Sequence, residues 1–369
     1  MFQRSLTDKR RVIIVDYMHM AWAYAFGQAT SLSCVLNING VSTVVDTTIP
    51  AYTIKALNRW SMGGFHPLAV CFDGVGSSRC RKAYFGKLFG LNSDGSAVAY
   101  KAGRERKDQK FYDGVAITLS KLLEGGVSCY KAANYEADDL IKACVDNAKK
   151  TYPDLPIDII TGDHDLLPLV DDQVSVFIRS RKTTYAESKD IEKPHYVQVT
   201  PRNFEEYLSE LNAYKNLEVP YNTVLLAKLL RGDKSDGIPG AAGWKPKMYK
   251  ELIRRLKYLG YDLGELFRYD APTETVVTGA DGQPMIQYGE PPKLTAICEA
   301  FKACGCDDSD SVWARQIYNG INLNGAFTGM GTFDRKPAVI QTPISSYDVY
   351  KLQLAVKKDL QIELKTYDW

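Results

Sequence analysis

The sequence has few of the residues that bind soft metals. Only four of its 369 residues are histidine, and none of its eight cysteines is part of a C-x-x-C pair. Structural zinc sites depend on these two residue types at short spacings, so a zinc site is not expected. Several cysteines lie within apolar runs, and we therefore expect reduced thiols and a cytoplasmic protein.

Membrane-directing segments and several glycine signatures are also missing. The first residues, MFQRSLTDKRR, contain no apolar signal core, and no apolar run approaches the roughly 20 residues of a membrane span, so we expect no membrane association. The patterns G-x-x-x-x-G-K-[ST], G-x-S-x-G and G-x-G-x-x-G do not occur. An NTPase with a P-loop, a serine hydrolase and a dinucleotide-dependent oxidoreductase therefore lack support.

The sequence does contain acidic residues placed where apolar runs end. Nine of them fall in five separated segments: Asp16 in RVIIVDYM, Asp73 in LAVCFDG, Glu136, Asp138 and Asp139 in YEADDLI, Asp163 and Asp165 in IITGDHDLL, and Asp233 and Asp236 in RGDKSDGIPG.

Three of these segments read as a short strand that ends in Asp. The carboxyl ends of parallel strands open on one edge of a sheet, so Asp16, Asp73 and Asp163 are predicted to converge there. Carboxylates gathered in one place repel one another unless cations neutralise them. Because hard divalent ions prefer oxygen ligands, the pattern predicts a site for two or more Mg²⁺ ions. Such a site is suited to hydrolysis of phosphodiesters.

Each group of acids also has a purely structural explanation. Glu136, Asp138 and Asp139 would complement the macrodipole at the start of a helix. Asp163 and Asp165 would form an Asx-turn. His164 between them is either a contact for phosphate or, as we expect, a solvent-facing turn residue. The combination of all five segments favours the metal site over these separate explanations.

The net charge of +2 conceals two basic zones. Residues 79–110 contain nine Lys or Arg against three acids, and residues 228–257 contain the same numbers. Basic flanks beside an acidic centre would hold a polyanion such as DNA. Two solvated surfaces are the alternative explanation.

Strands and helices alternate along the first half of the chain, which predicts an α/β fold with a mostly parallel sheet flanked by helices. We expect strands at 12–15, 68–72, 127–130, 157–161 and 174–178, and helices at 51–62, 111–124 and 135–150, the last capped by Asn134. Hairpin signals occur at 35–49 and 273–288, with turns at Asn39-Gly40 and Asp281-Gly282. Helices are also expected at 221–231 and 246–258, on either side of a glycine-rich loop.

At these residues the sequence resembles the flap endonuclease or 5′-nuclease family, which includes phage 5′-nucleases such as phage ribonuclease H and the 5′→3′ exonuclease domain of bacterial DNA polymerase I. The resemblance covers residues 11–258, about two thirds of the chain. Its motifs occur in family order: Val-Asp at 15–16, Phe-Asp-Gly at 72–74, Tyr-Lys at 100–101 with Arg104, Tyr-Glu-Ala-Asp-Asp at 135–139, Thr-Gly-Asp-His-Asp at 161–165, and Gly-Asp-Lys-Ser-Asp-Gly-Ile-Pro-Gly at 232–240.

The resemblance implies a role for each motif. Asp16, Asp73, Glu136, Asp138 and Asp163 would surround the catalytic metal, and Asp139, Asp165, Asp233 and Asp236 would complete a second position, with Mg²⁺ as cofactor and Mn²⁺ as a substitute. Lys101 and Arg104 would contact the scissile phosphate from the base of a helical arch at about 79–115, where Arg79, Arg81 and Lys82 would bind DNA. Loop 232–247 would be a helix-three-turn-helix element that binds duplex DNA through Gly237, Gly240, Gly243, Lys245 and Lys247 and holds K⁺.

The implied domains are a PIN-like catalytic domain (1–218), a helix-three-turn-helix region (219–330) with the hairpin insertion 273–288, and a C-terminal extension of unknown role (331–369). The chain departs from the family at Ala23, where a basic residue is usual, and at Lys245, where a small glycine is usual.

The implied function is a monomeric, Mg²⁺-dependent 5′ nuclease. It would remove RNA primers and 5′ flaps during replication of a phage genome, beside partners such as a single-strand-binding protein or a clamp. A PIN-type ribonuclease and a nuclease-dead protein that binds DNA structures are the alternatives. The glycine-rich loop disfavours the first, and the nine intact acids disfavour the second.

Overall fold

The computed structural model describes a little more than half of the chain, and the structural statements below concern these residues only. They are residues 10–25, 32–38, 41–74, 108–131, 136–179, 196–211, 214, 217–231, 246–266, 274–278, 282, 284–288, 296, 299–300 and 302–303.

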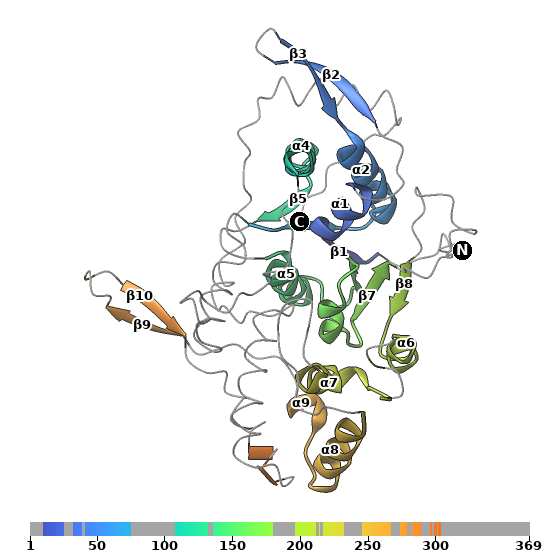
Figure 1. Cartoon of the computed structure of the whole chain (residues 1–369), viewed down its shortest axis with the longest axis vertical. Helices are drawn as coiled ribbons and strands as arrows, with labels where there is room; N and C mark the ends of the chain where they lie inside the picture. The colour runs from blue at the N-terminus through green and yellow to red at the C-terminus, as the bar shows by residue number, and fades with distance from the viewer. Residues whose placement is uncertain are drawn as a thin grey trace.

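A six-stranded sheet forms the centre of the described structure (Figure 1). Its spatial order is β5-β4-β1-β6-β7-β8, and every neighbouring pair is parallel except β7 with β8. All residues of β1, β4 and β6 are buried, which explains their nearly continuous apolar sequences. The strands are β1 (Val12–Asp16), β4 (Leu68–Phe72), β5 (Ser128–Lys131), β6 (Ile157–Thr161), β7 (Val174–Arg179) and β8 (Tyr196–Val199).

Helices cover both faces of this sheet (Figure 1). On one face, α1 (Tyr17–Ala25), α2 (Thr48–Trp60) and α4 (Gln109–Glu124) pack against Ile13 and Val15 of β1. On the other, α5 (Ala137–Thr151) and η2 (His164–Leu169) pack against Val12 and Ile14. Successive strand residues point to opposite faces, so β1 contributes to both cores.

The C-terminal helices extend the second of these cores (Figure 1). Leu226 and Ala227 of α7 are fully buried in it, as is Leu256 of α8. The Thr223 hydroxyl and the Tyr249 hydroxyl are 2.7 Å apart and connect η3 to α8. These elements are α6 (Phe204–Glu210), η3 (Tyr221–Thr223), α7 (Val224–Arg231), α8 (Pro246–Tyr258) and α9 (Leu263–Leu266).

Two antiparallel hairpins project from the body (Figure 1). The first joins β2 (Ser33–Ile38) to β3 (Val41–Asp46), with Ile38 opposite Val41, as expected for a turn at Asn39-Gly40. The second joins β9 (Glu274–Thr278) to β10 (Pro284–Tyr288), and Gly282 between them has a φ of +76°. Both predicted hairpins are confirmed.

The predicted α/β fold is confirmed in the described part of the chain, which has a mostly parallel sheet flanked by helices on both faces. Three details differ from the sequence-based expectation. The N-cap of α5 is Glu136 rather than Asn134, because Glu136 has extended backbone angles and forms a capping box with Asp139. The helix expected at 221–231 begins as the 3₁₀ turn η3, and β8 and α6 were not predicted.

Several expectations lie outside the described residues, among them residues 79–107 of the predicted arch, residues 232–245 of the predicted loop 232–247, and the extension 331–369. Residues 109–115 of the segment assigned to the arch form the start of α4, whose N-cap Asp108 accepts a bond from the Phe111 N–H. Cys71, Cys129 and Cys144 are buried free thiols. Among the described helices, none is both long and apolar enough to cross a membrane.

Candidate active site

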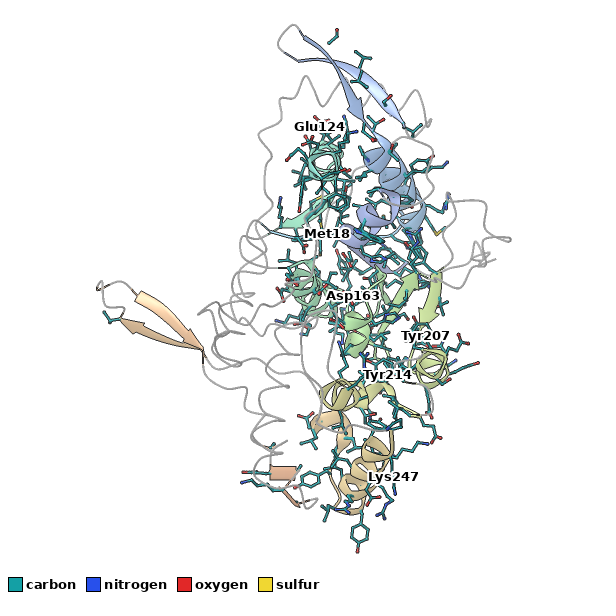
Figure 2. All side chains as sticks on the ribbon, in the orientation of Figure 1. Met18, Glu124, Asp163, Tyr207, Tyr214 and Lys247 are labelled. Carbon is teal, nitrogen blue, oxygen red and sulfur yellow. The ribbon has the colours of Figure 1, made fainter. Side chains whose placement is uncertain are left out.

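Three adjacent strands bring the candidate site residues to one edge of the sheet. Asp16 ends β1, Asp73 follows β4, and Thr161 ends β6 two residues before Asp163. Because β4 and β6 flank β1 on either side, the order of the strands reverses at β1. The crevice at such a reversal, outside the carboxyl ends of the strands, is the usual ligand position in an open α/β sheet. Asp163 lies near the centre of the molecule, between the sheet and the C-terminal helices (Figure 2).

Asp16 is the most buried of the three strand-end acids, with 5% of its surface exposed. Its Oδ2 accepts a hydrogen bond of 2.8 Å from the Thr161 hydroxyl, and its Oδ1 accepts one of 3.2 Å from the His19 backbone N–H. Burial is the main reason that the pKa of Asp16 rises from 3.8 to about 7. The charges of Asp163 and Asp73 raise this pKa further, and the two hydrogen bonds lower it.

Thr161 connects two of these acids. Its hydroxyl donates to Asp16 and accepts a hydrogen bond of 3.0 Å from the Asp163 backbone N–H. One side chain therefore fixes the carboxylate of β1 relative to the chain that leaves β6. The motif Thr-Gly-Asp-His-Asp contained this residue, but the sequence gave no signal that its hydroxyl would bridge the acids.

Asp73 and Glu136 both cap α5. The Ala137 N–H donates a hydrogen bond of 2.8 Å to Oδ1 of Asp73. The Glu136 side chain accepts from the Asp139 N–H, and Oδ2 of Asp139 accepts from the Glu136 N–H at 3.0 Å. Asp138 lies in the first turn and is buried. The helix therefore uses these acids in the structural way considered above, and the same contacts hold them beside the carboxyl edge of β4.

Asp163 and Asp165 form the Asx-type turn that was considered above as their structural explanation. Oδ1 of Asp163 accepts a hydrogen bond of 2.9 Å from the Asp165 N–H and caps η2. The Asp165 carboxylate forms a buried ion pair with Lys228 of α7. No sequence pattern indicated this lysine, since the two residues are far apart in the chain.

His164 does not face solvent as predicted. It is half-buried, and its Nε2 lies 3.0 Å from the hydroxyl of Tyr207, against which its ring stacks. The prediction was wrong because α6, which carries Tyr207, had not been anticipated from the sequence.

His19 is a further residue at this edge that the sequence did not reveal. A Cβ placed on Gly162 would lie 1.7 Å from Nε2 of His19, so the imidazole rests directly on this glycine. His19 also donates its backbone N–H to Asp16. Glycine at position 162, between Thr161 and Asp163, is required for this approach.

In the described part of the chain, no three Asp, Glu, His or Cys side chains form a group that could hold one metal ion. The physical reason is that several carboxylates of this edge are directed at helix N-termini: Asp73 and Glu136 at α5, and Asp163 at η2. The chemistry of the donors nevertheless suits a hard divalent cation, since all are carboxylate oxygens. The charges of Asp73 and Asp163 also act on the buried Asp16.

Most of the residues predicted to contact DNA or the scissile phosphate lie outside the described residues, as do Asp233 and Asp236 of the second metal position. Of the predicted DNA contacts, Lys247 alone is described, and it is exposed in the first turn of α8 at the far end of the molecule from the β2–β3 hairpin (Figure 2). The others are Lys101, Arg104, Asp233, Asp236, Arg79, Arg81, Lys82, Gly237, Gly240, Gly243 and Lys245.

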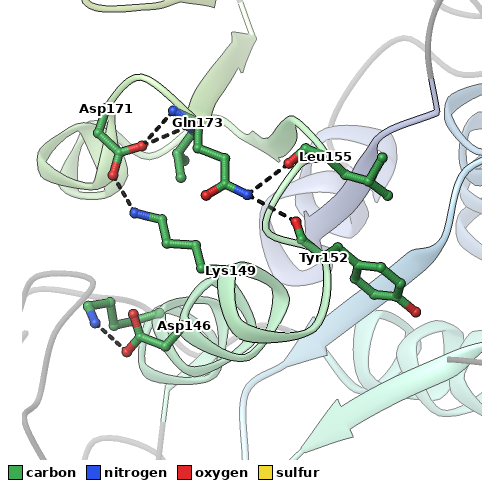
Figure 3. Close-up of polar contacts among 8 residues, drawn as sticks. Asp146, Lys149, Tyr152, Leu155, Asp171 and Gln173 are labelled. Atoms are coloured by element: carbon green, nitrogen blue, oxygen red, sulfur yellow. Dashed lines mark hydrogen bonds and ion pairs between the residues drawn. The ribbon is translucent and has the colours of Figure 1, made fainter.

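The opposite, amino-terminal edge of the sheet has a different chemistry (Figure 3). Oδ1 of Asp171 accepts from the Gln173 and Val174 N–H groups, and its other oxygen pairs with Lys149 of α5. The Gln173 amide donates to the carbonyl oxygens of Tyr152 and Leu155 at 3.1 and 2.9 Å. Here each acidic group shown is paired with a cation or with backbone donors, as expected for a structural turn.

The fold and the site together define a class of protein: a resolvase-like α/β domain with an acidic carboxyl edge. The family model for the 5′-3′ exonuclease N-terminal resolvase-like domain matches residues 11–195. The chain therefore belongs to the 5′-3′ exonuclease family, whose members are hydrolases of phosphodiester bonds.

Two sequence relatives agree with this assignment. Over 249 residues the chain is 27% identical to a 5′-3′ exonuclease of Bacillus subtilis (strain 168), covering 67% of this chain and 71% of that protein. It is 25% identical over 249 residues to DNA polymerase I of Lactococcus lactis subsp. cremoris (strain MG1363), covering 68% of this chain but only 24% of the polymerase. The chain thus spans about a quarter of that relative. Among solved structures, the flap endonuclease D15 of bacteriophage T5 superposes with a TM-score of 0.48 at 12% identity, covering 94% of this chain and 100% of that one.

Proposed function

We propose that this chain is a divalent-metal-dependent 5′ nuclease that hydrolyses phosphodiester bonds near the 5′ ends of DNA. The observation that carries the proposal is the placement of Asp16, Asp73 and Asp163 at the carboxyl ends of three adjacent strands. Membership of the 5′-3′ exonuclease family supports the same reaction.

Asp16, Asp73 and Asp163 would hold the first metal ion, together with Glu136 and Asp138. Asp139, Asp165, Asp233 and Asp236 would serve a second. Magnesium is the expected ion, because the donors are hard oxygens, and Mn²⁺ would substitute for it. When bound, such ions supply an activated water and stabilise the leaving oxygen. We also propose a K⁺ ion in loop 232–247.

The residues of the chain itself would orient this site and bind the polyanion. The Thr161 hydroxyl donates a hydrogen bond to the Asp16 carboxylate, and the His19 imidazole packs directly on Gly162 at the same edge of the sheet. Exposed Lys247 lies at the start of α8, where it would contact a duplex phosphate. Lys101 and Arg104 would contact the scissile phosphate.

The substrates would be DNA with a 5′ flap or a free 5′ end, and RNA primers on DNA. The similarity to DNA polymerases I supports a task in replication. We propose that the protein acts as a monomer in the cytoplasm of a cell that replicates a phage genome, with a single-strand-binding protein or a clamp as partner.

The test is cleavage of a 5′-labelled flapped DNA duplex with Mg²⁺, repeated with EDTA and with Asp163→Asn. The asparagine keeps an oxygen that can accept from the Asp165 N–H, so η2 remains capped while the charge is lost. Asp146→Asn, which changes an exposed acid paired with Lys142, is the matched control.

We expect cutting near the junction of single strand and duplex with the wild type and with Asp146→Asn. EDTA and Asp163→Asn should abolish it while flap binding persists. Tight binding of the flap without any cutting would identify a nuclease-dead DNA binder. Cutting of single-stranded RNA but not of the flap would identify a ribonuclease.

A further inference from the structure

Lys228 forms an ion pair with Asp165 that connects the C-terminal helices to the candidate active site. The Nζ of Lys228 contacts Oδ1 of Asp165, and the two side chains are only 3% and 11% exposed. Lys228 lies on α7 and Asp165 on η2, and these elements are in contact. A lysine ammonium is rarely buried to this degree unless an anion compensates it, so the pair determines where both side chains lie.

The last turn of α7 is fixed independently of this pair. The Arg231 guanidinium lies 4.7 Å from the centre of the Tyr214 ring, and its Nη2 donates to the Tyr214 hydroxyl at 3.2 Å. Leu226 and Ala227 of the same helix are completely buried. Lys228 is therefore presented to Asp165 from a helix that is held by its packing and by the Arg231 contact. After Arg231 the chain continues directly into the segment that contains Asp233 and Asp236.

Asp165 is also coupled to the carboxyl edge of β6. Its backbone N–H donates to Oδ1 of Asp163, whose own N–H donates to Thr161. Hydrogen bonds therefore connect Asp165 through Asp163 and Thr161 to Asp16. The Lys228 ammonium places one positive charge beside Asp165, at one end of this series of contacts.

We propose that Lys228 is a positioning residue that neutralises Asp165 from within the protein and competes with a divalent cation for this carboxylate. The proposal rests on the proposed function, because it requires a cation at the carboxyl edge. The ammonium on Oδ1 repels a cation that binds the same carboxylate, so the second cation binds more weakly than its carboxylate ligands alone would allow. Because Lys228 lies on α7, binding of the second cation at Asp165 is thereby coupled to the position of this helix.

The experiment is a calorimetric titration of the full-length, DNA-free protein with Mn²⁺, comparing wild type with Lys228→Met. Methionine keeps much of the length and the apolar stem of lysine but removes the charge. We expect the weaker Mn²⁺ site to gain affinity by about tenfold or more. Lys228→Arg should resemble the wild type.

Lys149→Met is the matched control, because it also removes a lysine that pairs with an aspartate, at the opposite edge of the sheet. It should leave Mn²⁺ affinity unchanged. Asp165→Asn should abolish the gain when combined with Lys228→Met, since the competed carboxylate is then gone.

Loss of the ammonium removes a buried positive charge beside Asp165, so Lys228→Met is expected to lower Tm, and Mn²⁺ should raise Tm more than in the wild type. If the variant is unfolded without cation, millimolar Mn²⁺ should refold it, and failure to do so would overturn the proposal. Unchanged or weaker Mn²⁺ binding by a folded Lys228→Met protein would overturn it as well. If the wild type itself binds no Mn²⁺, the metal-dependent function fails first, which distinguishes the two results.

Discussion

The backbone N–H of Ala137 donates a hydrogen bond of 2.8 Å to Oδ1 of Asp73. This contact joins the chain that leaves β4 to the first turn of α5, so a single carboxylate serves both the helix and the candidate active site. The two roles of Asp73 can be separated by mutation.

Asp73→Asn should retain the cap and lose the negative charge, whereas Asp73→Ala should lose both. We expect Asp73→Ala to lower the free energy of unfolding by about 0.5–2 kcal/mol and Asp73→Asn to change it much less. Both variants should lose cleavage. Urea unfolding followed by circular dichroism, together with the flap assay, measures the two effects. Equal stability of the two variants would show that the Ala137 contact contributes nothing to folding.

Asp16 should make the stability of the protein depend on pH. Its pKa is about 7 in the folded protein and ordinarily 3.8, so the folded state binds this proton more tightly than the unfolded chain does. The contribution of Asp16 is therefore most favourable below pH 4 and is lost as the pH rises through 7. Asparagine cannot ionise, so Asp16→Asn should avoid the cost of a buried charge at high pH. It should raise the free energy of unfolding of the metal-free protein at pH 8 by on the order of 2 kcal/mol.

Asp158→Asn is the control for that experiment. Asp158 is a fully buried acid of β6, but it pairs with Arg11 at 2.9 Å, so its neutralisation should destabilise the protein instead. Thermal unfolding between pH 4 and pH 8 compares the variants. Our view of Asp16 would be wrong if Asp16→Asn were also destabilising at pH 8.

Thr161→Val should lower the affinity of the candidate site for Mn²⁺ without changing the packing around residue 161. Valine is close to threonine in volume but cannot donate to Oδ2 of Asp16 or accept from the Asp163 N–H. Because the hydrogen bond from Thr161 lowers the pKa of Asp16, its loss should raise that pKa. The free energy of unfolding should fall by about 1.5–3 kcal/mol. Thr161→Ser keeps the hydroxyl and should stay near the wild type. Mn²⁺ titration of both variants measures the difference, and equal affinities would contradict the bridging role.

Gly162→Ala should displace His19. The new methyl group would lie 1.7 Å from Nε2 of the imidazole, so the ring must leave its place over the chain between Thr161 and Asp163. We expect a loss of about 1–3 kcal/mol in the free energy of unfolding, together with reduced cleavage.

A double-mutant cycle with His19→Ala isolates this contact. In the His19→Ala background, Gly162→Ala should cost little, because the atoms with which it collides are gone. A cost that is the same in both backgrounds would mean that another neighbour, and not His19, requires the glycine.

Much of the central fold was predictable because local sequence specifies it. Strands β4 and β6 and helix α8 have the predicted bounds, and both predicted hairpins are present. Buried parallel strands are short apolar runs, and an Asn-Gly or Asp-Gly pair between two alternating segments specifies a tight turn. By contrast, β8 and α6 were missed. The antiparallel edge strand is only four residues long and half-buried, so its sequence carries little periodic signal.

The sequence by itself determined that Asp16, Asp73 and Asp163 lie at the carboxyl edge, since each stands at or just after the end of a strand whose place in a parallel sheet fixes that edge. Only the tertiary structure decided what these acids contact. Lys228, His19 and Tyr207 reach Asp165, Gly162 and His164 from helices that come together only when the two cores form. Such partners depend on packing between segments distant in the chain, and no spacing within the sequence encodes them.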